Sequence, residues 1–81
     1  MPDEEPDERE VVNVAAEAAE SVVFSRYERS QVRDLDVTVT FEQGQLEVDV
    51  YIDVTDETTD PEQVAEDAVL AARSAVDDLF E

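Results

Sequence analysis

The sequence predicts an α+β fold, a two-layer α-β-β-α sandwich in which one antiparallel hairpin carries two helices packed on one face. Two observations predict it. Apolar residues recur every three or four positions near both ends of the chain, as on one face of a helix, and they alternate with polar residues in the middle. Both alternating segments place their apolar residues on a single face, so we expect the two helices to cover that face.

The first helix is expected to begin near Pro6 or Asp7 and to end at about Arg29. Residues 1–7 are acidic and proline-containing, which predicts a flexible, solvated arm ahead of a single α+β domain formed by residues 8–81. Helical spacing predicts an apolar face that comprises Val12, Ala15, Ala16, Ala19, Val22, Val23 and Tyr27.

The alternating segments predict a hairpin with strands at about residues 35–42 and 46–55. Gly44 is the one glycine in the chain, and it can adopt the positive φ that a tight hairpin turn requires. If Phe41 lies opposite Leu46, every apolar residue of one strand meets an apolar residue of the other. The expected pairs are then Phe41 with Leu46, Val39 with Val48, Val37 with Val50 and Leu35 with Ile52.

The second helix is expected to follow a polar loop and to continue to the C-terminus. Asp60 is suited to the N-cap, Pro61 to the first helical position and Gln63 to the third. An alanine-rich core buries little area, and a two-stranded sheet leaves two open edges, so a homodimer with a four-stranded sheet is expected to relieve both. The predicted apolar face comprises Val64, Ala68, Ala71, Ala72, Ala75, Val76 and Leu79.

The charge of the chain predicts its environment. Asp and Glu number 24 against five basic residues, all arginine, which gives a net charge of −19 on 81 residues without any lysine. This composition resembles that of haloarchaeal proteins, whose carboxylates stay hydrated in molar salt, where charge repulsion is screened. No signal peptide or membrane span of about 20 apolar residues is visible, so we expect a cytoplasmic protein.

The residue types that are absent exclude most catalytic chemistry. Without histidine, cysteine or lysine, the chain has no imidazole base, thiolate or Schiff-base amine, and one glycine cannot form a phosphate-binding loop. We therefore expect no enzymatic activity and no cofactor. The oxygen-rich segment 53–62 lacks the glycine that a calcium loop needs at its sixth position, so we expect no metal site either.

A cluster of arginines is the strongest local signal. Arg26, Arg29 and Arg33 lie within eight residues, beside Tyr27, near the end of the first helix. The cluster has two interpretations. It could bind a phosphate, an RNA backbone or an acidic partner, or it could oppose the helix dipole and pair with acids of the same molecule.

Two apolar residues depart from the helical pattern and are candidates for an interface. Phe24 falls on the acidic side of the first helix, and Leu70 falls among acidic and polar residues of the second. A single exposed apolar residue is common in proteins. On a surface this strongly charged, each is also a candidate contact with a partner.

Four stretches of the chain together resemble a known family. Residues 22–27, 32–41, 46–51 and 71–80 are similar to those of a family of small, uncharacterised archaeal proteins, in a haloarchaeal version. The resemblance implies no catalytic or binding residue. Genes of the family tend to lie near the prefoldin beta subunit and translation-related genes, which implies a role around protein synthesis or folding.

These observations favour an uncharacterised, halophilic, cytoplasmic and non-enzymatic domain that interacts with an unknown protein partner and is linked to translation or chaperone machinery. One alternative is an RNA- or phosphate-binding module that uses Arg26, Arg29 and Arg33. Another is an acidic mimic of nucleic acid that occupies a basic protein surface. Salt separates the first two hypotheses, because binding of RNA by arginines weakens steeply with salt, whereas apolar contacts persist.

Overall fold

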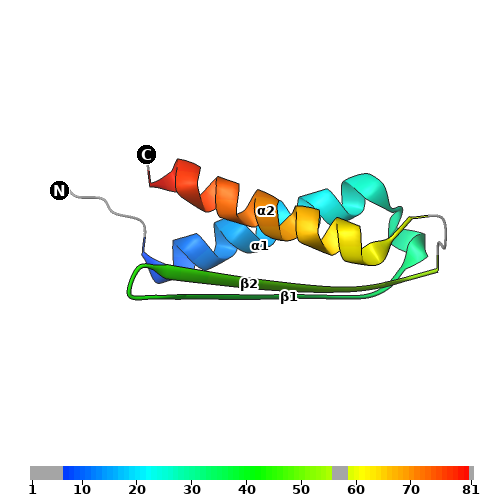
Figure 1. Ribbon diagram of the computed structural model, residues 1–81, viewed down its shortest axis with the longest axis horizontal. Coiled ribbons are helices and arrows are strands. Elements are labelled where there is room, and N and C mark those ends of the chain that lie inside the picture. The colour runs from blue at the N-terminus through cyan, green and yellow to red at the C-terminus, as the bar shows by residue number, and fades with distance from the viewer. Residues whose placement is uncertain (1–6, 56–58, 81) are drawn as a thin grey trace.

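The computed structural model describes residues 7–55 and 59–80. Of the predicted arm, residues 1–6 lie outside the described residues, whereas Asp7 is the N-cap of the first helix. Figure 1 shows the order of the elements along the chain. They are α1 (Glu8–Arg26), a short 3-10 helix η1 (Arg29–Gln31), β1 (Val32–Glu42), β2 (Gln45–Val54) and α2 (Pro61–Leu79).

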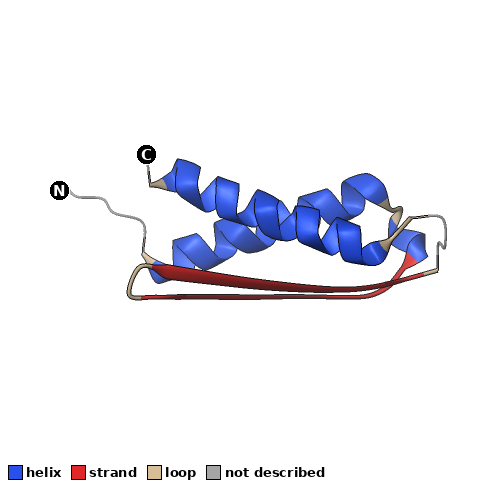
Figure 2. Cartoon of the chain, viewed as in Figure 1, coloured by secondary structure: helices blue, strands red, loops and turns tan. Residues whose placement is uncertain are grey.

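The two helices form one layer and the hairpin forms the other, which confirms the predicted α+β fold. Figure 2 shows both helices on the same face of the hairpin. The two helices pack mainly on each other, and α1 also packs on β1 while α2 also packs on β2. The molecule is elongated, with extents of 49 × 19 × 16 Å. Within the described residues, no helix has the length and apolar character needed to cross a membrane.

The hairpin has the predicted register. Phe41 lies opposite Leu46, and the three other apolar pairs follow in order. The turn residues Gln43 and Gly44 have φ values of 54° and 80°, as in the two-residue turns that match the twist of a hairpin. The pairing is interrupted only between Val32 and Asp34, where Arg33 occupies a bulge.

Helix α1 ends three residues earlier than predicted. It stops at Arg26, and Tyr27 already has extended backbone angles. The backbone N–H of Glu28 donates to the side-chain oxygen of Gln31 at 2.9 Å, which stabilises a short 3-10 turn in place of further α-helix. The chain thereby changes direction and enters β1 at Val32.

The core lies along the line where the two helices meet. On α1 the fully buried residues follow a four-residue step, with Val11 at its start; the sequence predicted Val12 there, and Val12 is only half-buried. A four-residue row is the ridge that packs between helices, and it explains the difference. The core residues of the two helices, together with Tyr27 directly after α1, are Val11, Ala15, Ala19, Val23, Tyr27, Val64, Ala68, Ala72 and Val76.

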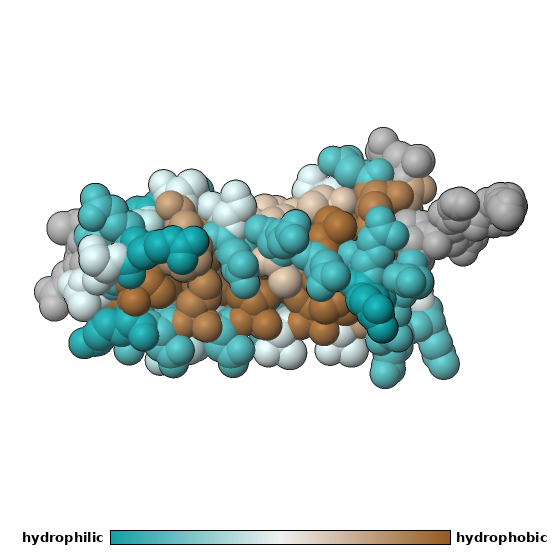
Figure 3. All heavy atoms as spheres, turned by 180° about the vertical axis from the view of Figure 1, so that it is seen from behind, coloured by the Kyte–Doolittle hydropathy of each residue, from teal (hydrophilic) through white to brown (hydrophobic). Residues whose placement is uncertain are grey.

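The sheet side of the core is less completely covered. Of the ten apolar strand residues that form the core or pack against it, only Val48 and Ile52, both on β2, are buried. Seen from behind, on the side of α1 and β1, a band of apolar atoms remains visible between the layers (Figure 3). The half-buried apolar residues of the two strands are Val32, Leu35, Val37, Val39, Phe41, Leu46, Val50 and Val54.

Candidate protein-interaction site

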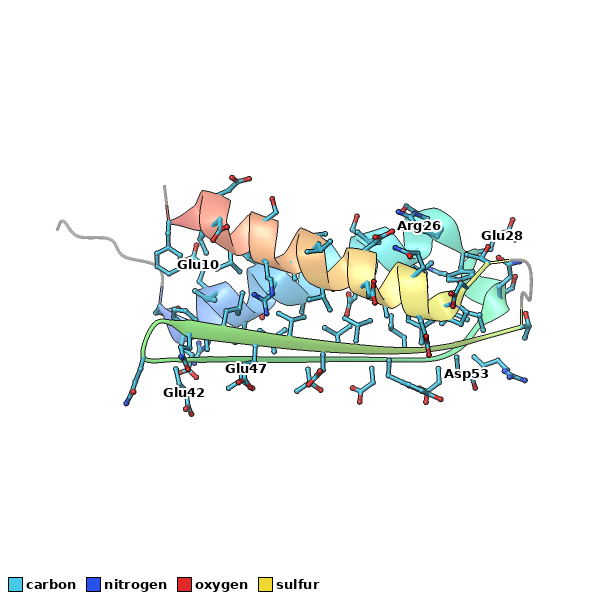
Figure 4. All side chains as sticks on the ribbon, in the orientation of Figure 1. Glu10, Arg26, Glu28, Glu42, Glu47 and Asp53 are labelled. Atoms are coloured by element: carbon cyan, nitrogen blue, oxygen red, sulfur yellow. The ribbon has the colours of Figure 1, made fainter. Side chains whose placement is uncertain are left out.

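Arg26 is held by an ion pair between the two helices. One of its guanidinium nitrogens, Nη2, lies 2.9 Å from Oδ2 of Asp67 on α2, and the side chains are 44% and 28% exposed. In Figure 4 the Arg26 side chain lies at the end of α1 that is next to the start of α2. The pair therefore links the C-terminal end of α1 to the N-terminal half of α2.

Arg33 and Arg29 contact different partners. The Nη2 of Arg33 donates to Oδ1 of Asp53 on β2 at 3.0 Å, so this ion pair spans the hairpin at the bulge. The guanidinium of Arg29 lies 4.8 Å from the centre of the Phe24 ring, within the range of a cation–π contact. Each arginine of the predicted cluster thus has its own intramolecular partner.

The other predicted residues of this region are partly or fully covered. Tyr27 is 2% exposed and belongs to the core, so it does not present its ring to solvent. Phe24 is half-buried, with Arg29 over its ring. An anion that bound Arg26 or Arg33 would have to compete with Asp67 or Asp53 for the guanidinium.

Leu70, the second interface candidate, lies in a shallow apolar groove. It is 64% exposed, more than any other large apolar residue of the described chain. The groove has a volume of about 390 Å³ and lies between α2 and the edge of β2. We call it the α2/β2 groove, and it is lined by Asp49, Val50, Ala65, Glu66, Val69 and Leu70.

The helical pattern of the sequence predicts Leu70 as an interface residue but does not predict its neighbours in the groove. Alternation places Val50 with the core, and Val69 falls outside the apolar face predicted for the second helix, so neither residue is predicted to form a site. Both are half-buried and contact the core from its margin, where the groove begins. The charged residues of the groove, Asp49 and Glu66, are exposed acids. The groove therefore combines an apolar floor with an acidic rim.

A second hollow lies at the turn end of the molecule. It has a volume of about 470 Å³ and is lined in part by Arg73, Gly44 and the rings of Phe41 and Phe80, whose centres are 5.9 Å apart. Among the described residues, Arg73 makes no ion pair. Sequence reasoning missed this site because the turn and the end of α2 meet only in the folded chain.

The outer face of the hairpin is acidic. Glu42 and Glu47 project away from the helices in Figure 4, and the polar residues of both strands are exposed except for Asp53, which is half-buried. Asp34 and Asp53 lie opposite each other across the two strands, and Arg33 pairs with Asp53. Within the described residues, acidic side chains do not gather in a group of three or more that could hold a metal ion.

Comparison with known proteins places the chain in a family. Residues 4–79 match the family described as "Protein of unknown function (DUF3194)". An uncharacterized protein of Natronomonas pharaonis, a haloarchaeon, is 54% identical over 78 residues, which cover 96% of this chain and 93% of that protein. The search of solved structures returned no match. The family match and this relative together show that the chain belongs to the DUF3194 family, whose function is unknown.

Proposed function

We propose that this protein is a non-enzymatic protein-interaction domain of a salt-rich cytoplasm and that the α2/β2 groove binds an apolar side chain of a protein partner. The exposed side chain of Leu70 supports this proposal most directly, because it stands 64% exposed beside an apolar floor. Burying a leucine side chain completely contributes about 1.5–3 kcal/mol, so covering Leu70 would contribute a large part of that energy.

The environment that we propose also favours an apolar contact. At molar salt the Debye length is about 3 Å, so attraction between exposed charges is largely screened, whereas the burial of apolar surface is not weakened by screening. The net charge of −19 and the similarity to a haloarchaeal protein support the salt-rich environment. A link to translation or chaperone machinery rests on the family resemblance alone.

The arginine cluster gives weaker support to a function in RNA or phosphate binding. Arg26 and Arg33 are paired with carboxylates, and Arg29 lies over the Phe24 ring. These contacts occupy part of each guanidinium and would compete with a bound anion. The acidic outer face of the hairpin gives some support to the other alternative, a mimic of nucleic acid that binds a basic surface, and such binding would weaken steeply with salt.

The proposal is tested by capturing partners at molar KCl from a haloarchaeal lysate with tagged wild-type protein, Leu70→Asp and Ser74→Asp. Ser74 is exposed on α2 one turn beyond Leu70 and does not line the groove, so this variant controls for the added charge. We expect a protein that is retained by the wild type and Ser74→Asp and lost from Leu70→Asp.

Two outcomes would contradict the proposal. One is that Leu70→Asp retains every protein that the wild type retains. The other is the capture of RNA without a protein partner, abolished by replacing Arg26, Arg29 and Arg33 together with glutamine. Circular dichroism of each variant would establish that a lost interaction does not reflect loss of the fold.

A further inference from the structure

We infer that the α2/β2 groove receives its partner as an extended β-strand, which pairs with the free edge of β2 and becomes a third strand of the sheet. This inference rests on the proposed function, and it specifies how the partner binds. It also specifies the partner's sequence pattern, in which apolar residues alternate with basic ones.

The edge of β2 is available for pairing. The sheet has two strands, so within the described residues β2 is paired on one side only. In an antiparallel strand, alternate residues direct their N–H and C=O groups toward the neighbour, and the intervening residues direct theirs to the other edge. The ten residues of β2 therefore offer a row of backbone donors and acceptors beside the groove.

The widths of the two layers leave room for one strand. Packed helices lie about 8–10 Å apart, whereas paired strands lie about 4.8 Å apart. Because α1 packs on β1 and α2 packs on β2, and two packed helices are wider than two paired strands, we expect the helices to extend beyond the hairpin at both edges. The groove beside β2 lies beneath this overhang, with Ala65 and Val69 half-buried and Leu70 at its margin.

The β2 edge is better suited to this role than the β1 edge. The large apolar residues that are exposed in the described chain are Tyr51, Leu70 and Phe80, and none of them belongs to α1 or β1. Two of the three, Tyr51 and Leu70, lie on β2 and α2. A strand at the β2 edge would therefore cover Leu70, the most exposed of these side chains, whereas a strand at the β1 edge would cover only the half-buried apolar residues visible in Figure 3.

A second copy of this chain fits the edge poorly. In an antiparallel four-stranded sheet formed by two hairpins about a two-fold axis, all four helices would lie on one face. Four helices require about 30–40 Å of width, whereas four strands provide less than about 20 Å. The overhanging α2 would collide with the partner's α2, so a single strand without its own helices is the occupant that the geometry favours.

Charge limits the pattern of that strand, because its outer side chains would stand only about 5 Å from the acids of β2, where salt screens less than between distant exposed charges. The outer face of β2 presents Glu47, Asp49 and Asp53, and the groove is also flanked by Glu66. Directly opposed like charges destabilise a pair of strands, and opposite charges stabilise it. The added strand would thus carry lysine or arginine on its outer face and aliphatic residues on the face beneath α2.

The first test uses a fluorescent synthetic decapeptide of alternating valine and lysine, with binding followed by anisotropy at molar KCl. A decapeptide matches the ten residues of β2. We expect it to bind at least about tenfold more tightly than a peptide with five valines followed by five lysines, which has the same charge and composition. Equal affinity of the two peptides, or no binding of the alternating one, would overturn the inference.

The second test separates strand pairing from simple occupation of the groove. Methylating one backbone nitrogen of the peptide at a time should weaken binding at every second position, because only those N–H groups face β2. Leu70→Asp should weaken binding and Ser74→Asp should not. If Leu70→Asp abolishes binding but methylation has no alternating effect, the groove binds a partner in another conformation, and strand addition is wrong while the proposed function stands.

The third test examines a second copy as the occupant. Sedimentation of the protein alone at molar KCl should give the mass of a monomer for the wild type and for Leu70→Asp. A wild-type dimer that dissociates in Leu70→Asp would assign the groove to self-association and would overturn the inference.

Discussion

Small side chains determine how closely the two helices approach each other. Ala15 and Ala19 on α1 and Ala68 and Ala72 on α2 are fully buried in the line of contact between the helices. An alanine row allows close approach of two helices but leaves no space for a longer side chain. The stability of this core therefore depends on volume at these positions more than on hydrophobicity.

Replacing Ala19 with leucine is expected to destabilise the protein, although leucine is more apolar. The added atoms would force the helices apart or strain side chains, at a cost of about 1–3 kcal/mol. Thermal unfolding at molar KCl should show this as a lower melting temperature. Ser21→Leu, at an exposed position of the same helix, should leave the melting temperature nearly unchanged. A stabilised Ala19→Leu variant would contradict the tight packing of α1 on α2.

The ion pair between Arg26 and Asp67 is expected to contribute little to stability. Its two side chains are 44% and 28% exposed, and solvent-exposed pairs typically contribute about 0–1 kcal/mol before screening by salt. Arg26→Gln should therefore differ from Arg73→Gln, which removes the same charge without breaking a described ion pair, by less than about 1 kcal/mol in urea unfolding. A larger difference in the free energy of unfolding, if it disappears in the Asp67→Asn background, would show that Arg26 and Asp67 interact more strongly than solvent-exposed ion pairs do.

Local sequence signals predicted some features of the elements and could not predict others. The hairpin register followed from Gly44 and the alternation of apolar residues, because a one-residue slip would turn the whole apolar face to solvent. The end of α1 did not follow, since it depends on the turn that Gln31 stabilises. The partners of Arg26 and Arg33 also could not be identified, because Asp67 and Asp53 lie on other elements.

Of the candidate site, one residue was predicted from the sequence and the groove around it was not. Leu70 was recognised because it interrupts a helical pattern, which is a property of one segment. Its groove was not recognised, because the exposure of Val50 and Val69 depends on how far α2 extends beyond β2. That overhang results from the different widths of helices and strands and is therefore a property of the assembled layers.

The turn of the hairpin is expected to tolerate few residues at Gly44. Its φ of +80° lies in the left-handed region, which costs an L-residue with a Cβ about 1–2 kcal/mol. No atom lies within 4 Å of the place where a Cβ would stand, so the cost is conformational and not steric. Gly44→Ala should lower the free energy of unfolding by about this amount and Gly44→Asn by less, because asparagine tolerates this conformation. Equal stability of Gly44→Ala and the wild type would show that the turn adopts another conformation.

At the scale of the whole molecule, charge opposes the fold that the apolar residues favour. The chain carries a net charge of −19, and no charged residue of the described chain is buried. The carboxylates occupy the outer face of the hairpin and the outer sides of both helices. Within the described residues, Arg26 and Arg33 each form an ion pair with one of these carboxylates. The repulsion among the carboxylates is therefore mostly uncompensated by cations of the same molecule, and its strength depends on the surrounding ions.

The melting temperature is accordingly expected to fall steeply as KCl is diluted. The Debye length is about 10 Å at 0.1 M salt and about 3 Å at 1 M, so repulsion between carboxylates across a molecule 16–19 Å thick is restored over this interval. Helical circular dichroism followed against temperature at several KCl concentrations would measure the effect.

A variant with three fewer negative charges provides the matched control. Asp36→Asn, Glu47→Gln and Asp49→Asn together change the net charge from −19 to −16 on the exposed face of the hairpin, without altering its apolar face. This variant should melt at a higher temperature than the wild type in dilute salt, and the two should converge at molar KCl, where screening removes the difference. A wild-type melting temperature indifferent to salt would mean that self-repulsion does not limit this fold, and the acidic face would then be better explained by a basic partner than by a salt-rich environment.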